Sequence, residues 1–282
     1  MIERLAIVGV GLLGGSAALA VRKLGLAREI VGVGRDAARL APALDAGVLD
    51  RATTDVGAGV AEADFVLLAA TVAANEDLLG AVWKATAPGT IVTDVGSTKR
   101  GIVRVAEALA RSRPLTFVGS HPMAGSERSG WAAARADLFT GATVIVTPGE
   151  RTEASAVKRV GGFWEALGAR VSALDAETHD HTVAAISHLP HLVAVALVEA
   201  VAATSPGAFA FAGRGFKDTT RIAAGDPRMW QEIFVANGDV LAGSVRAFRT
   251  ALDGLLARIE AGDTAGLEDA LAGVAATRRG LA

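Results

Sequence analysis

The chain opens with an apolar run, a glycine-rich turn and a segment of helical length, and this order constrains its fold more than any other feature. The run Leu5–Val8 is followed at once by GVGLLG at positions 9–14 and by an alanine-rich stretch that ends near Leu24. In a strand–turn–helix unit, the first glycine permits the tight turn, the second lets a pyrophosphate approach the backbone, and the third lets the helix pack on the sheet.

The free N–H groups at the start of such a helix attract phosphate. We therefore predict a dinucleotide site at the start of a helix that runs from Gly14 to Leu24. The residues expected to contact the dinucleotide here are Gly9, Gly11, Leu12, Leu13 and Gly14.

Apolar and helical segments alternate through the first 174 residues. Segments rich in Val, Ile, Leu and Thr predict strands at Leu5–Val8, Ile30–Val33, Phe65–Ala69, Thr90–Asp94, Thr116–Val118, Thr143–Thr147 and Ala169–Leu174. This alternation predicts a parallel sheet with helices on both faces, joined by right-handed crossovers. The expected fold class is α/β, with an N-terminal doubly wound Rossmann domain at residues 1–174.

The second part of the chain, residues 175–282, reads as helical. One long helix is predicted from His179 to Ala203, interrupted or kinked at Pro190. Asp226-Pro227 is a typical helix start, and a last helix ends near Arg279. We expect an all-α substrate and dimerisation domain, because so apolar a helical segment is best buried in a homodimer.

Composition narrows the possible partners. The 282 residues are 51% hydrophobic, enough for two cored domains, and the net charge of −2 gives no reason to expect nucleic acid or a membrane as partner. Apolar runs such as Val193–Leu197 are interrupted by Glu199, and we expect none to reach the ~18 residues of a membrane span. With no cysteine and no signal-peptide pattern, we expect a cytoplasmic protein.

The end of the second predicted strand bears on cofactor choice. An NAD site places a carboxylate at this tip for the ribose 2′-hydroxyl, whereas an NADP site offers a small residue and an arginine for the 2′-phosphate. The tip here is Gly34, followed by Arg35, and this favours NADP over NAD. Asp36 comes one residue later and is the alternative ribose contact.

Two polar side chains follow predicted strands at the edge where such sheets bind ligands. Ser97 lies in DVGSTK at 94–99, and His121 lies just beyond a strand in GSHPMAGSE at 119–127. Both are expected near the nicotinamide. A histidine beside a hydride-transfer site is a natural acid or base, although a loop histidine also serves purely structural purposes.

Further polar pairs occur at helical spacing. His188 and His191 share one helix face. Asp218 and Arg221 are either a plain surface ion pair or an aspartate that orients an arginine for bidentate carboxylate binding. The chain has no cysteine and no HExxH pattern, so we expect no metal site.

Together these motifs make the chain similar to the prephenate/arogenate (cyclohexadienyl) dehydrogenase family of tyrosine biosynthesis. The resemblance covers nearly the whole length, and its motifs are specific jointly rather than singly. They are GVGLLGGS at 9–16, DVGSTK at 94–99, SHPMAGSE at 120–127, SHLPH at 187–191, and GFKDTTR at 215–221 followed by DPRMW at 226–230. The resemblance implies oxidative decarboxylation of prephenate or arogenate with hydride transfer to NAD(P)⁺, giving 4-hydroxyphenylpyruvate or tyrosine.

The resemblance also implies roles for single residues. His121 resembles the catalytic histidine at the substrate C4 hydroxyl, and Ser97 the hydroxyl that positions that histidine and the nicotinamide. Arg221 resembles the arginine that holds a substrate carboxylate, with Asp218 orienting it. The other residues implied for the substrate pocket are Ser126, Glu127 and His191, with His188 as the structural neighbour of His191 and a further pocket residue. Asp94 and Thr71 are further candidates for cofactor contact, although the loop Thr71-Val72-Ala73 departs from the family pattern, in which a proline often follows a small polar residue.

Two other classes remain open from the sequence. One is another two-domain NADP oxidoreductase, of the β-hydroxyacid dehydrogenase or imine reductase type, which usually places a lysine or another donor in its helical domain. The other is a non-catalytic dinucleotide sensor, which would lack His121, Ser97 or Arg221; all three are present.

Overall fold

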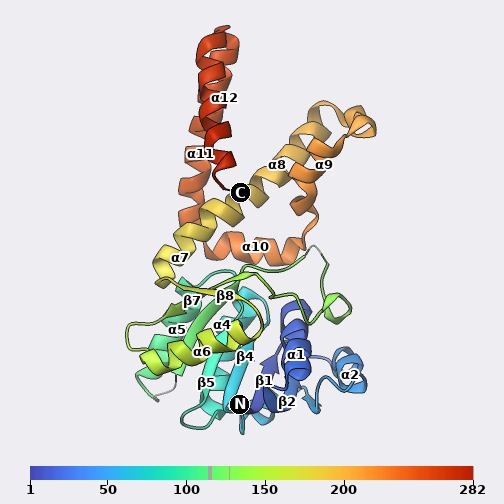
Figure 1. Ribbon diagram of the computed structural model, residues 1–282, viewed down its shortest axis with the longest axis vertical. Coiled ribbons are helices and arrows are strands. Elements are labelled where there is room, and N and C mark those ends of the chain that lie inside the picture. Colours follow the sequence, from blue (N-terminus) through green and yellow to red (C-terminus); the bar gives the residue numbers. More distant parts are fainter. Residues whose placement is uncertain (114–115, 127, 282) are drawn as a thin grey trace. The chain divides into compact units, whose positions relative to one another are not determined.

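The computed structural model describes residues 1–113, 116–126 and 128–281 and contains one eight-stranded sheet (Figure 1). Its strand order is β3-β2-β1-β4-β5-β6-β7-β8. The strands are β1 (Ile2–Val8), β2 (Ala27–Val33), β3 (Arg51–Thr53), β4 (Phe65–Leu68), β5 (Ile91–Asp94), β6 (Thr116–Pro122), β7 (Thr143–Pro148) and β8 (Arg170–Ala173). This doubly wound arrangement confirms the predicted fold class.

Helices cover both faces of the sheet, as the alternation predicts. Helices α1 (Leu12–Leu24) and α6 (Ala154–Ala166) share one apolar core with the sheet, and α3 (Val56–Val60), α4 (Val72–Ala85) and α5 (Arg100–Ala110) share the other. The short helix α2 (Ala37–Asp45) follows β2.

The central strand β1 explains why its sequence is continuously apolar rather than alternating. Leu5 and Ile7 belong to the core on the α1 side, whereas Ala6 and Val8 belong to the core on the opposite side. All four side chains are buried. A strand covered on both faces has no polar positions to offer, as in other parallel sheets.

The expectation of a wholly parallel sheet is wrong at one strand. Strand β7 runs antiparallel to β6, with His121 paired to Ile145, and the parallel direction returns between β7 and β8. The described residues between β6 and β7 contain only a 3₁₀ turn, Trp131–Ala133, and no long crossover helix. An antiparallel neighbour needs no such crossover, which accounts for the reversal. The short edge strand β3 was also not predicted.

The predicted long helix is present but is divided by a π-helical turn. Helix α7 (Ala176–Val183) continues through the π turn Ala184–His188 into α8 (Leu189–Thr204). Pro190 is the second residue of α8, in the turn that follows the π turn, as expected for a residue that cannot donate a helical hydrogen bond. Helices α9 (Arg214–Thr220) and α10 (Pro227–Ala236) follow. The predicted start of α10 is confirmed, because the Asp226 side chain accepts hydrogen bonds from the N–H groups of Arg228 and Met229.

Contacts within the chain divide it into two compact units, 1–238 and 239–282. The second unit consists of most of α11 (Gly238–Glu260) and of α12 (Thr264–Arg279), which Asp263 caps through the N–H of Gly266. The domain boundary near residue 175 stays a prediction.

One expectation about apolar runs needs correction. Because α7, the π turn and α8 are continuous, the helix Ala176–Thr204 is long and apolar enough to cross a membrane by length and composition. Only 28% of its most apolar window is buried. The same test is passed by core helices of soluble proteins, so by itself this finding does not indicate a membrane.

Candidate active site

A cavity of about 570 Å³ opens at the carboxyl ends of the central strands, where such sheets bind their ligands. Its floor comes from the ends of β4, β5 and β6 and from the turn before α1, and its other walls come from the π turn, α8 and α10. The predicted site residues among its lining are Leu12, Leu13, Thr71, Ser97, His121, Ser126, His188, His191 and Arg221.

The glycine turn before α1 fits a dinucleotide. Gly9 has φ of 103°, and a Cβ there would lie 2.6 Å from the carbonyl oxygen of Ala69. A Cβ on Gly14 would lie 2.0 Å from the carbonyl oxygen of Gly9, so close packing of helix on turn requires glycine. A Cβ on Gly11 would meet nothing within 4 Å, and no side chain caps α1. The open space and the uncapped N–H groups match what a pyrophosphate needs.

The three residues at the tip of β2, Gly34, Arg35 and Asp36, differ in their contacts and so in what they could offer a cofactor. The carboxylate of Asp36 caps α2 and accepts a hydrogen bond of 2.9 Å from the N–H of Ala38. Arg35 is exposed, and no ion pair of its side chain occurs among the described residues. Gly34 lies against Leu40 and leaves the tip without a side chain. The aspartate is thus committed to the helix, while the guanidinium is available to a ligand.

His121 lies inside β6, one residue before its end, rather than beyond the strand as predicted. The parallel pairing of β5 with β6 ends at Val118, but the antiparallel pairing with β7 prolongs the strand. Burial lowers the pKa of His121 well below its ordinary value, and the nearby side chains of His179 and Lys99 lower it further. The ring is therefore neutral at pH 7 and able to accept a proton.

Two residues that were not predicted from the sequence lie next to this histidine: His179 contacts it directly, and Asp180 contacts His179. His179 and Asp180, adjacent on α7, are both fully buried, and Nε2 of His179 lies 2.9 Å from Nδ1 of His121. The available signal was a His-Asp pair at the start of a helix. Ser97, the partner implied by resemblance, lines the cavity but makes no hydrogen bond to His121 in the described part of the chain.

Asp94 lies beneath the cavity instead of lining it. Its carboxylate accepts hydrogen bonds from the N–H groups of Gly96 and Ser120 and pairs with Lys99, whose ammonium group is fully buried. Burial lowers the pKa of Lys99, and Asp94 opposes that effect. This buried pair holds together the ends of β5 and β6 that carry Ser97 and His121.

His188 lines the cavity, and its neighbours fix which ring nitrogen carries the proton. Arg100 donates a hydrogen bond of 3.0 Å to Oδ1 of Asn237, so the amide nitrogen of Asn237 faces Nδ1 of His188 at 3.3 Å. Nδ1 must then accept, because an amide N–H₂ group only donates. Burial lowers the pKa of His188 to about 4, so at pH 7 the ring is neutral with its proton on Nε2. That Nε2 atom is buried without a partner in the described structure, as is Nδ1 of His191.

The remaining predicted residues lie at the rim. Arg221 is exposed at the start of a 3₁₀ turn and lines the cavity. Asp218 is exposed on α9 and is not among the described lining residues. The Ser126 hydroxyl makes hydrogen bonds with the backbone of Arg128, and Glu127 lies outside the described residues.

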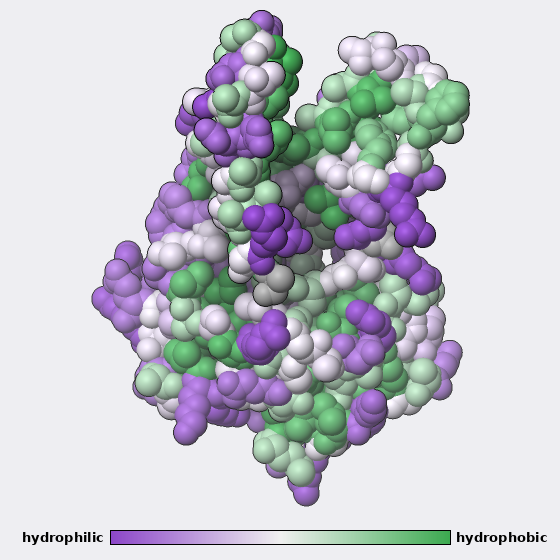
Figure 2. Space-filling view, turned by 45° about the horizontal axis from the view of Figure 1, so that its top comes forward, coloured by the Kyte–Doolittle hydropathy of each residue, from purple (hydrophilic) through white to green (hydrophobic). Residues whose placement is uncertain are grey.

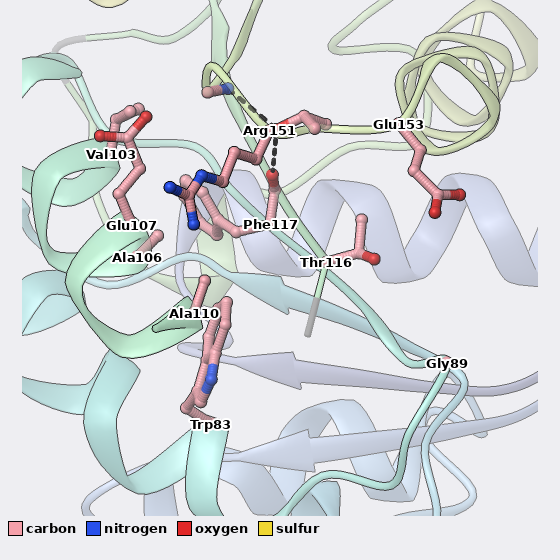
Figure 3. Close-up of a pocket in the computed structure, with 12 residues that line it drawn as sticks. Trp83, Gly89, Val103, Ala106, Glu107, Ala110, Thr116, Phe117, Arg151 and Glu153 are labelled. Carbon is pink, nitrogen blue, oxygen red and sulfur yellow. Dashed lines mark hydrogen bonds between the residues drawn. The ribbon is translucent and has the colours of Figure 1, made fainter. Parts of the chain in front are cut away.

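A second cavity of about 380 Å³ lies on another part of the molecule, between α4, α5 and the loop after β7 (Figure 3). Figure 3 shows Trp83, Phe117, Glu107 and Arg151 around it. Its described lining contains no histidine and none of the buried polar atoms that lack a partner. The chemistry of the chain therefore points to the first cavity.

The Rossmann sheet, the dinucleotide turn and a neutral histidine at the strand ends define a nicotinamide-dependent dehydrogenase. The chain belongs, more narrowly, to the prephenate dehydrogenase family. The sequence model for the nucleotide-binding domain of prephenate dehydrogenase matches residues 17–173, and that for its dimerization domain matches residues 175–273. The family's reaction is the oxidative decarboxylation of prephenate or arogenate with NAD(P)⁺.

Known proteins show the same relationship. The prephenate dehydrogenase of Bacillus subtilis is 37% identical over 85% of this chain, and the match spans 65% of that protein's length. A crystal structure of prephenate dehydrogenase from A. aeolicus, in complex with hydroxyphenyl propionate and NAD⁺, has a TM-score of 0.93 at 33% identity and covers 100% of this chain and 99% of its own. Synechocystis arogenate dehydrogenase has a TM-score of 0.85 at 29% identity, covering 99% and 100%.

The alternative oxidoreductases are more distant. An imine reductase from Myxococcus stipitatus has a TM-score of 0.51 at 15% identity, which indicates a shared fold and nothing further.

Proposed function

We propose that this chain oxidatively decarboxylates a cyclohexadienyl acid, prephenate or arogenate, with NADP⁺ as the preferred acceptor. The observation that carries the proposal is the placement of a neutral, buried His121 in the cavity that adjoins the dinucleotide turn. His188 and His191 line the same cavity, and each has one buried ring nitrogen without a partner in the described structure. Such a set suits a small polar acid that must lose a proton and a hydride at one carbon.

Each proposed role follows from what the side chain can do. The substrate C4 hydroxyl would give its proton to His121, and a nicotinamide held at the dinucleotide turn would supply the hydride acceptor, so that C4 would become a ketone. The bond to the ring carboxylate then breaks, CO₂ leaves, and the electron pair completes the aromatic ring as a phenolate, which takes up the proton. Because aromatisation drives the last step, the protein mainly has to align C4 and hold the proton.

Substrate binding is assigned to the donors of the cavity. Nε2–H of His188 and the ring of His191 would hydrogen-bond oxygens of the substrate. Arg221 would hold a carboxylate through its fork of donors, with Asp218 orienting it and Ser126 and Glu127 closing the rim. Ser97 would position the nicotinamide, with Thr71 as a further cofactor contact.

NADP preference rests on the tip of β2. Arg35 is exposed and Asp36 is engaged as a helix cap, so a 2′-phosphate has a cationic partner while a 2′-hydroxyl lacks an obvious carboxylate.

We further propose a cytoplasmic homodimer formed through the helical residues after position 175. Figure 2 shows hydrophobic side chains gathered over α8 and, separately, along one edge of α11 and α12. Exposed apolar residues of these helices are Val195, Leu252, Leu256, Ile259, Leu271 and Val274. Apolar area of this kind favours association, and the matching family model describes a dimerization domain.

The test is the initial rate of absorbance change at 340 nm, with prephenate and arogenate each offered with NAD⁺ and NADP⁺. Turnover with either acid supports the proposed reaction, and the four rates assign substrate and cofactor. No turnover in any combination, with NADP⁺ still binding, would contradict it.

A further inference from the structure

Three buried side chains form a hydrogen-bonded series that ends at the proposed base. Nδ1 of His121 lies 2.9 Å from Nε2 of His179, and Nδ1 of His179 lies 2.7 Å from Oδ1 of Asp180. The two rings meet edge to face, at 60° between their planes. Each contact between nitrogens needs one donor and one acceptor, so the protonation of one ring decides that of the next.

The series begins at an ionised Asp180. Its oxygens accept hydrogen bonds from the backbone N–H of Lys99 at 2.8 Å, from that of Arg100 at 3.0 Å and from the Arg100 guanidinium. Burial alone would raise the pKa of Asp180, but these donors and His179 outweigh it and hold the pKa below its ordinary value. An ionised carboxylate only accepts, so Nδ1 of His179 carries the proton.

The ring of His179 passes the effect of Asp180 on to His121. Burial lowers the pKa of His179; the hydrogen bond to Asp180 opposes that effect, and the charge of Lys99 reinforces it. His179 is therefore neutral at pH 7, with its lone pair on Nε2. That lone pair must accept the proton on Nδ1 of His121, and the lone pair of a neutral His121 is then on Nε2.

We propose that Asp180, acting through His179, holds His121 as the Nδ1–H tautomer, so that Nε2 is the basic atom available to the substrate. The inference rests on the proposed role of His121 as the base. When the substrate hydroxyl gives its proton to Nε2, the imidazolium still donates Nδ1–H to His179, and its charge forms at the end of a series anchored by a carboxylate. His179 and Asp180 are positioning residues, since neither is among the described residues lining the cavity.

The wild-type enzyme tests the tautomer directly. In ¹⁵N NMR spectra of protein labelled at histidine, at pH 7 and without substrate, we expect His121 to be protonated on Nδ1 and not on Nε2. His121→Asn assigns its signals. A proton on Nε2 of His121 would overturn the proposal. This measurement needs no turnover, so its failure is distinct from failure of the proposed reaction.

Asp180→Asn tests the origin of the constraint. The new amide N–H₂ group would donate to Nδ1 of His179 and move the proton of that ring to Nε2. The tautomer of His121 would then change as well, leaving its proton on Nε2. By analogy with the same change in a Ser-His-Asp triad, we expect kcat to fall on the order of 10²–10⁴-fold with KM changed only slightly. The ¹⁵N NMR signals of His121 should then show the proton on Nε2 instead of Nδ1. Near-wild-type kcat in a folded Asp180→Asn protein would overturn the proposal.

A matched pair at His179 gives an answer even if Asp180→Asn does not fold. His179→Gln keeps an acceptor, because Asp180 attracts the amide N–H₂ group and turns the amide oxygen toward His121. His179→Leu removes the acceptor. We expect the Gln variant to retain at least about tenfold more kcat than the Leu variant, with cofactor binding equal in both and with exposed His181→Gln as control. Equal kcat in the two variants would contradict the proposed series.

Discussion

The imidazole of His191 lies flat on the indole of Trp230, with ring centroids 3.5 Å apart and planes 15° apart. The contact joins α8 to α10 and leaves Nδ1 of His191 buried without a hydrogen-bond partner in the described structure. Burial lowers the pKa of His191. The ring is thus neutral and fixed in its plane, and under the proposed function an oxygen of the substrate would be its partner.

Buried neutral histidines should make the fold acid-sensitive. The pKa of His188 is about 4 in the folded protein and about 6.5 when unfolded, so the unfolded chain binds the extra proton between these values. The free energy of unfolding should therefore fall as pH drops from 6.5 to 4, by about 3 kcal/mol for this residue alone. His121, His179 and His191 shift in the same direction.

Urea unfolding at several pH values measures this dependence. Replacement His188→Gln should reduce the slope between pH 6.5 and 4, whereas His181→Gln, at an exposed position of α7, should leave it unchanged. A slope that is the same in both variants would show that His188 is not buried in its neutral form.

Loss of the proposed base should reduce the rate of chemistry rather than binding. We expect His121→Asn to lower kcat on the order of 10²–10⁴-fold with little change in substrate KM. Steady-state kinetics at saturating cofactor test this, with His181→Asn as an exposed control. Turnover close to that of the wild type would remove His121 from the role of base.

Loss of the proposed carboxylate clamp should show the opposite pattern. Arg221→Ala removes charged hydrogen bonds that contribute about 1.5–3 kcal/mol, so the KM for the acid should rise roughly tenfold or more. Arg221→Lys should be intermediate, because an ammonium lacks the planar fork. Arg170→Ala, at an exposed position of β8, is the control. An unchanged KM in Arg221→Ala would exclude the clamp.

Cofactor choice is tested at Arg35. Its replacement by Ala should raise the KM for NADP⁺ roughly tenfold and leave the KM for NAD⁺ nearly unchanged, because only the 2′-phosphate uses the guanidinium. Arg28→Ala, at the other end of β2 with a side chain 72% exposed, should affect neither. Equal effects on both cofactors would point to a general rather than a 2′-phosphate contact.

Two glycines of the turn before α1 should separate binding from folding. Gly11→Ala adds a methyl group to open space, so stability should stay within about 0.5 kcal/mol while the Kd for the cofactor rises at least roughly tenfold. Gly14→Ala forces a methyl group against the carbonyl oxygen of Gly9 and should cost about 1–3 kcal/mol of stability. Thermal melting without NADP⁺ measures the stability of the two variants, and melting with NADP⁺ measures their cofactor binding. Gly80→Ala on α4 is the control. Tight cofactor binding by Gly11→Ala would contradict the proposed pyrophosphate position.

Patterns within single segments were enough to predict those parts of the fold that depend on residues close together in the chain. The fold class was predictable because the apolar runs, the glycine turn and the helix starts each act through neighbours along the chain. Asp226 capped its helix as predicted for that reason. The reversal at β7 was not predictable, because an apolar strand does not record the direction of its neighbour.

Some residues of the candidate site could likewise be predicted from the sequence, and others could not. The sequence motifs, and the family resemblance that they carry, were enough to predict His121, His188, His191 and Arg221 as site residues, and the structure has all four in the lining of one cavity. Only the tertiary structure brought His179 and Asp180, which follow His121 by 58 and 59 positions, into hydrogen-bonded series with it. Which nitrogen of a histidine carries the proton depends on the group that faces it, and that group is decided by packing.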